Sequence, residues 1–98
     1  DPGRAEIMYE LAWANAMLGD MDSARQLINR SMSIDPDDPY VHYYDALVSV
    51  KEGRYDHAIA ALRESVAGGN PAIMLANEPH LSALRDMPEF KQLISPSD

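Results

Sequence analysis

Gly19-Asp-Met-Asp-Ser-Ala24 returns at an offset of 34 residues as Gly53-Arg-Tyr-Asp-His-Ala58. The glycine, the second aspartate and the alanine are identical in the two stretches, and Ser31 falls on Ser65 at the same offset. A glycine readily takes the left-handed conformation that ends a helix, and an aspartate after it can cap the next helix. The motif therefore predicts a tight turn between two helices, and its recurrence predicts two successive helix pairs.

A period of 34 residues with this turn resembles the tetratricopeptide repeat. At the signature positions of that family, repeat one reads Met8, Leu11-Ala12, Asn15, Ala24, Ile28 and Pro36. Repeat two reads His42, Asp45-Ala46, Ser49, Ala58, Leu62 and Asn70. The match covers about residues 5–72 and degrades in the first helix of repeat two, where His42 and Asp45 replace apolar residues.

The resemblance implies an all-α, helix-turn-helix solenoid with two full repeats and a short helical C-terminal cap. We expect one domain over 1–98, in which 1–4 end a preceding repeat, 5–38 form repeat one, 39–70 form repeat two and 71–98 form an irregular helical cap. Asp1-Pro2 stands 34 residues before Asp35-Pro36. We therefore expect the chain to be a fragment of a longer, multidomain bacterial protein.

Apolar residues at helical spacing predict helices over about 4–18, 21–34, 39–52 and 55–67. In the last third, Pro71, Pro79 and Pro88 exclude a long helix and predict short pieces near 72–76, 80–86 and 88–94. We expect the apolar residues of this segment to fold back on the fourth helix and cover it, as the end of a repeat array requires. These residues are Leu75, Leu81, Leu84, Phe90, Leu93 and Ile94.

The charge of the chain argues against two classes of partner. Its 8 Lys and Arg and 16 Asp and Glu give a formal net charge of −8, which repels phosphate backbones and anionic lipids. We therefore expect no nucleic-acid partner and no membrane partner. The sequence shows no signal peptide and no apolar run long enough to span a membrane, and we expect a cytoplasmic location.

No pattern of catalytic or metal-binding residues is recognisable. The chain has no cysteine, the three histidines, His42, His57 and His80, lack ligand spacing, and neither a phosphate loop nor a calcium loop is present. We expect no enzymatic activity and no cofactor. Asp45 occupies an apolar position of the family, so it needs a partner such as Arg30 or a neighbouring tyrosine, or else a local tilt that leaves it partly exposed.

The resemblance implies that the first helix of each pair lines a concave groove that binds another protein or a peptide. The residues expected to contact that partner are Tyr9, Trp13, Met17, Tyr40, Tyr43, Tyr44, Leu47 and Lys51. For Tyr43, Tyr44 and Leu47, the alternative is packing between neighbouring helices. The Lys/Asn clamp by which some relatives hold a carboxylate terminus is not expected, because only Lys51 remains of it.

These observations favour a protein-interaction module that recognises an apolar or amphipathic segment in an aromatic groove. Two alternatives stay open. The fragment could self-associate through the open side of its first helix, which includes Ile7 and Met8. It could also be a scaffolding or regulatory domain of a larger signalling or enzymatic protein.

Overall fold

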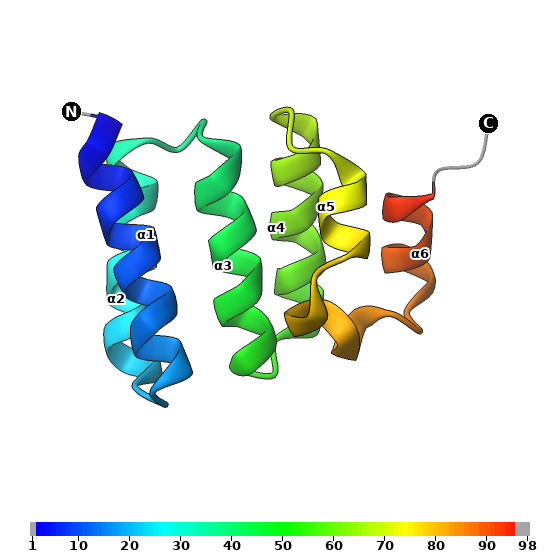
Figure 1. Ribbon diagram of the computed structural model, residues 1–98, viewed down its shortest axis with the longest axis horizontal. Helices are drawn as coiled ribbons and strands as arrows, with labels where there is room; N and C mark the ends of the chain where they lie inside the picture. The colour runs from blue at the N-terminus through cyan, green and yellow to red at the C-terminus, as the bar shows by residue number, and fades with distance from the viewer. Residues whose placement is uncertain (1, 96–98) are drawn as a thin grey trace.

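Four helices form two antiparallel pairs that stand side by side in the computed structural model (Figure 1). The structure describes residues 2–95. In the first pair α1 (Pro2–Met17) packs on α2 (Met21–Ile34), and in the second α3 (Pro39–Lys51) packs on α4 (Tyr55–Ala67). Because α3 also contacts both α1 and α2, the pairs stack as in a helical repeat. The expected all-α, helix-turn-helix fold is confirmed.

The two glycine turns have the predicted geometry. Gly19 has a φ of 89° and Gly53 a φ of 77°, which is the left-handed region that glycine occupies at low cost. After Gly19, the backbone N–H of Asp20 donates to the carbonyl of Asn15 at 2.9 Å, and after Gly53 that of Arg54 donates to Ser49 at the same distance. This pattern closes a helix end by satisfying carbonyls that have no partner within the helix.

A buried hydrogen bond also repeats with the 34-residue period. The Ser31 hydroxyl donates to the carbonyl of Ala5 at 3.1 Å, and the Ser65 hydroxyl donates to the carbonyl of Pro39 at 2.7 Å. Each bond ties the second helix of a pair to the beginning of the first. The side chains between the paired helices are small, because Ala12, Ala24, Ala46 and Ala58 are fully buried there. Small residues allow such close approach of two helix backbones.

The observed start of α1 differs from the expected one. Its first turn includes Pro2, Gly3 and Arg4, which the sequence assigned to the end of a preceding repeat, and Asp1 lies outside the described residues. A proline is well tolerated in the first turn of a helix, where its missing N–H would have no intrahelical partner. The division of the chain into repeats stays a prediction.

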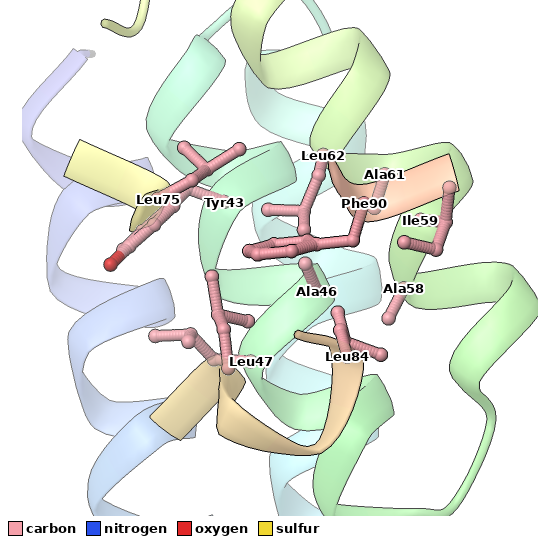
Figure 2. Packing of buried hydrophobic residues seen from close by; sticks show 11 residues of the cluster. Tyr43, Ala46, Leu47, Ala58, Ile59, Ala61, Leu62, Leu75, Leu84 and Phe90 are labelled. Atoms are coloured by element: carbon pink, nitrogen blue, oxygen red, sulfur yellow. The ribbon is translucent and has the colours of Figure 1, made fainter. Parts of the chain in front are cut away.

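Residues after α4 form three short elements, α5 (Ala72–Ala76), the 3-10 helix η1 (Pro79–Leu84) and α6 (Pro88–Ile94). Their bounds agree closely with the predicted pieces. Leu75, Leu81, Leu84 and Phe90 are fully buried, and Figure 2 shows the Phe90 ring in the middle of their cluster, with Leu62 of α4 above it and Ala46 of α3 below it. The segment therefore buries its apolar residues against the second helix pair.

The contacts of this segment differ in one respect from the expectation. Only α6 lies against α4, whereas η1 packs on α3. The reason is that α3 offers Tyr43 and Leu47 as apolar partners in the same cluster. The segment therefore covers both helices of the second pair rather than α4 alone.

Asp45 is buried, and its partner is Arg25 rather than Arg30 or a tyrosine. The Arg25 guanidinium lies 2.6 Å from the Asp45 carboxylate and 2.5 Å from that of Glu52, and it donates to the Ser49 hydroxyl at 3.0 Å. His57 Nε2 lies 3.3 Å from both Asp45 oxygens. Burial lowers the pKa of Arg25, but the hydrogen bonds and charges of Glu52 and Asp45 outweigh burial and raise it. The carboxylate therefore has a structural role between α2, α3 and α4.

Candidate functional site

The first helices of the two pairs enclose a hollow of about 340 Å³. Glu6, Tyr9 and Glu10 of α1 line one side, and Tyr40 and Tyr44 of α3 line another. Met74 of α5 completes the wall. A hollow with aromatic walls and a few polar groups is the usual form of a binding site.

Two tyrosines stack on each other across the two helix pairs. The ring centroids of Tyr9 and Tyr44 are 4.7 Å apart with an interplanar angle of 18°, and Tyr43 meets Tyr44 edge-on at 5.7 Å. The Tyr43 hydroxyl donates to Glu78 Oε1 at 2.7 Å. Within residues 2–95 the hydroxyls of Tyr9 and Tyr44 have no hydrogen-bond partner, so the hollow has polar groups available to a ligand.

Trp13 and Lys51 form a second contact one turn further along the groove. The Lys51 Nζ lies 5.6 Å from the Trp13 ring centroid, within the range of a cation–π interaction. The His80 ring of η1 meets the Trp13 ring edge-on at 4.9 Å. Trp13 also packs against both core clusters, so it is half-buried and stabilises the fold as well as facing the groove.

The eight predicted contact residues divide into three groups. Tyr9, Tyr40 and Tyr44 come together around the hollow, and Trp13 and Lys51 meet beside it, whereas Met17 lies on the surface of α1 with half of its side chain exposed. Tyr43 and Leu47 are buried in the core.

For Tyr43 and Leu47, the alternative of packing between helices describes their positions. Leu75 of α5 and Leu81 of η1 belong to the same cluster and cover this side of α3. A partner therefore has almost no access to these two side chains.

The sequence missed the part that the C-terminal segment plays in this site. Met74 lines the hollow, Glu78 accepts from Tyr43, and His80 touches Trp13. No local pattern signals these contacts, because they depend on how α5 and η1 turn back beside α3. The segment predicted as a cap therefore also shapes the groove.

The hollow has a negative electrostatic potential. Burial raises the pKa of Tyr9, and the negative charges of Asp38, Glu6 and Glu10 raise it further. Burial likewise raises the pKa of Tyr44, with contributions from Glu10, Glu78 and Glu6. None of the residues that line the hollow is a lysine or an arginine. The site therefore favours a cationic group over an anionic one.

Other kinds of site are not visible in the described part of the chain. Among residues 2–95, no three side chains of His, Asp or Glu come together as metal ligands would. No helix within the same range combines the length and the apolar character that crossing a membrane requires.

Comparison with known families identifies the repeat. The model of the tetratricopeptide repeat family matches residues 1–47, which include α1, α2 and the first part of α3. No curated protein and no solved structure matches the chain. Repeats of this family are typically non-catalytic and generally bind other proteins. By this match and by its stacked helix pairs, the chain carries a tetratricopeptide repeat and has the all-α helical-repeat fold of that family.

Proposed function

We propose that the chain binds an apolar or amphipathic segment of another protein in the groove between α1 and α3. The observation that carries this proposal is the hollow of about 340 Å³, which is walled by three of the predicted contact residues. Tyrosine rings supply apolar area together with a polar end, and such side chains are frequent among the energetically dominant contacts of interfaces.

The exposed residues of the groove are the ones that a partner would meet first. Tyr40 is 44% exposed and Met17 is 51% exposed, and Lys51 lies between them and the half-buried Trp13. The net charge of −8 favours a partner with basic residues, mainly by accelerating association. The partner segment is therefore amphipathic, with an apolar side toward the tyrosines.

The test uses Tyr40→Ala and compares it with Tyr55→Ala. Tyr55 lies on α4, is 42% exposed and does not line the hollow, so the two substitutions remove equally exposed rings. Short peptides selected from a displayed random library on the unaltered protein serve as the probe, and their affinities are measured by calorimetry. Tyr40→Ala should weaken binding about tenfold, whereas Tyr55→Ala should not. Selected peptides that bind both variants with unchanged affinity would contradict the groove assignment.

Trp13→Ala and Tyr44→Ala are less suitable for this test. Both side chains pack against the two core clusters, so truncation would also lower the stability of the fold. Tyr40 avoids this difficulty because of its exposure, and circular dichroism of each variant verifies that the helices remain intact.

Self-association is a second candidate function, favoured by an exposed stripe on α1. Ile7, Leu11 and Leu18 are 64%, 50% and 85% exposed, and their spacing places them on one face of the helix. Apolar residues gathered on one face commonly mark a contact surface. The stripe would suit a second helix pair stacked on α1, whether from another copy or from another part of a larger scaffolding or regulatory protein.

The division into repeats belongs to the same proposal. We propose repeat one over 5–38, repeat two over 39–70 and a helical cap over 71–98. The hydrogen bonds from Ser31 to Ala5 and from Ser65 to Pro39 support it, because each joins equivalent positions of one proposed repeat.

A further inference from the structure

We propose that the hollow receives the guanidinium group of an arginine carried by the bound segment. This inference rests on the proposed function, and it adds the chemistry of one contact. It is argued from four features of the hollow: two unpaired carboxylates, two unpartnered hydroxyls, a stack of aromatic rings and an apolar wall.

The first feature is a pair of carboxylates without a cation. Glu6 and Glu10 are four residues apart on α1, so their side chains lie on the same face, one turn from each other. The ion pairs among residues 2–95 involve Asp45 and Glu52, and none includes Glu6 or Glu10. A cation that enters the hollow would therefore meet two carboxylates that no other charged group neutralises.

The second feature is the hydroxyl of Tyr9. Tyr9 is only 5% exposed and lines the hollow, yet within residues 2–95 its hydroxyl finds no hydrogen-bond partner. A buried polar group without a partner is costly, and the hydroxyl of Tyr44 lacks a partner as well. A hydroxyl oxygen can accept a hydrogen bond from an N–H group, so a ligand with several N–H donors would satisfy both tyrosines.

The third feature is the aromatic and apolar wall. A planar guanidinium stacks on aromatic rings and offers five N–H donors, whereas an ammonium group is a compact, strongly hydrated point charge. Met74 and the half-exposed Tyr40 can cover the methylene groups behind the charged end. Arginine therefore fits the combination of rings, hydroxyls and carboxylates better than lysine does.

The electrostatics of the hollow agree with this assignment. The pKa of Tyr9 and that of Tyr44 are raised by burial and by carboxylates of three elements or turns, namely Glu6 and Glu10 of α1, Asp38 before α3, and Glu78 before η1. A potential that disfavours a tyrosinate anion favours a cation at the same place. The carboxylates act together, so the attraction does not depend on a single surface charge.

The experiment titrates the protein with N-acetyl-arginine amide and follows the backbone amides by NMR. N-acetyl-citrulline amide, which has the same shape without the charge, and N-acetyl-lysine amide are the comparison compounds. We expect saturable shifts around Tyr9, Glu10 and Tyr44 for the arginine compound, weaker binding of the lysine compound and no saturable shifts for the citrulline compound. Equal shifts with the citrulline compound, or none with the arginine compound up to its solubility limit, would overturn the proposal.

Variants separate a specific site from general charge attraction. Glu6→Gln with Glu10→Gln should weaken the arginine compound at least about tenfold, because charge-assisted hydrogen bonds are lost. The control pairs Glu64→Gln with Glu89→Gln, which removes the same charge from the exposed surfaces of α4 and α6 and should leave the affinity within about twofold. Equal weakening in both double variants would reduce the effect to net charge and contradict the site.

The peptides selected for the groove distinguish the two proposals. If they bind in a Tyr40-dependent manner but their affinity is unchanged when each arginine is replaced by citrulline, the groove stands and the arginine site fails. If the arginine compound binds the hollow while no selected peptide depends on Tyr40, the arginine site stands and the peptide groove fails.

Discussion

A single aspartate shows how a buried charge is accommodated in this fold. Asp45 stands where the family usually places an apolar residue, which signals from the sequence that a partner must exist. The sequence does not reveal which arginine of α2 supplies it, because Arg25 and Arg30 both lie within reach of α3 along the chain. They are five residues apart and thus lie on different faces of the helix, and only Arg25 faces α3.

The first prediction concerns that arginine. Arg25→Ala should lower the free energy of unfolding by about 3 kcal/mol, because it leaves a buried carboxylate without its main partner. The side chains of Arg25 and Asp45 are 19% and 9% exposed, so solvent screening is limited. Urea unfolding followed by circular dichroism measures the change. Arg30→Ala, at an exposed position of the same helix, should stay within about 0.5 kcal/mol, and equal losses in both variants would contradict the role of the ion pair.

Tyr43 gives the second prediction, on alkaline stability. Burial raises its pKa above the ordinary value of 10.0, and the hydrogen bond and charge of Glu78 raise it further. The unfolded chain therefore loses this proton near its ordinary pKa while the folded chain retains it. The stabilisation is complete below that pH and is lost as the pH rises toward the folded-state pKa, at about 1.4 kcal/mol per pH unit for the group.

Tyr43→Phe should consequently make the alkaline loss of stability less steep. Urea unfolding at a series of pH values from about 8 to 11 measures the slope. Tyr55→Phe, at an exposed position on α4, is the matched control. The interpretation is wrong if Tyr43→Phe declines with pH as steeply as the unaltered protein.

The C-terminal elements show which structural features local sequence determines. Prolines at 71, 79 and 88 set the beginnings of α5, η1 and α6, because a proline lacks the N–H of a helix interior but fits its start. The pieces predicted over 72–76 and 88–94 are confirmed. Their contacts with α3 and the groove could not be predicted, because the direction of each short element is set by the tertiary surfaces it covers rather than by its own periodicity.

Phe90 carries the third prediction, at the scale of this cap. The ring is fully buried between α3, α4 and the cap (Figure 2). Phe90→Ala should cost about 3–5 kcal/mol out of a total of about 5–15 kcal/mol, so the melting temperature should fall sharply and aggregation should increase. Lys91→Ala, at the next and exposed position, should melt like the unaltered protein.

Deletion from Met87 onward extends the same test. If the segment were a mobile tail that visits the groove, its deletion would leave the melting temperature nearly unchanged and would tighten the binding of the selected peptides. A calorimetric melting curve and a peptide titration on the same truncated protein separate this view from that of a fixed cap.

At the scale of the whole molecule, the 34-residue period predicted the stacking of two helix pairs but not the surface that the stacking creates. Tyr43 and Tyr44 are neighbours in the sequence and in the same predicted groove. The structure turns Tyr43 into the core, where α5 and η1 cover it, and leaves Tyr44 at the hollow beside Tyr9. Residue type and helical spacing give the side of a helix, whereas the extent of burial depends on elements more than 30 residues away along the chain.

The last prediction concerns association between whole molecules. The apolar stripe of Ile7, Leu11 and Leu18 on α1 is exposed, and its burial against a second copy would be favourable at about 25 cal/mol per Å² of apolar surface. Sedimentation over a range of concentrations should therefore show reversible self-association. Ile7→Glu should weaken it at least about tenfold, because a carboxylate would be buried without a partner. The matched control is Ile73→Glu, since Ile73 is 65% exposed on α5 against 64% for Ile7, and it adds the same charge away from the stripe. A protein that remains monomeric at high concentration, or equal effects of the two substitutions, would exclude the α1 stripe as the contact surface.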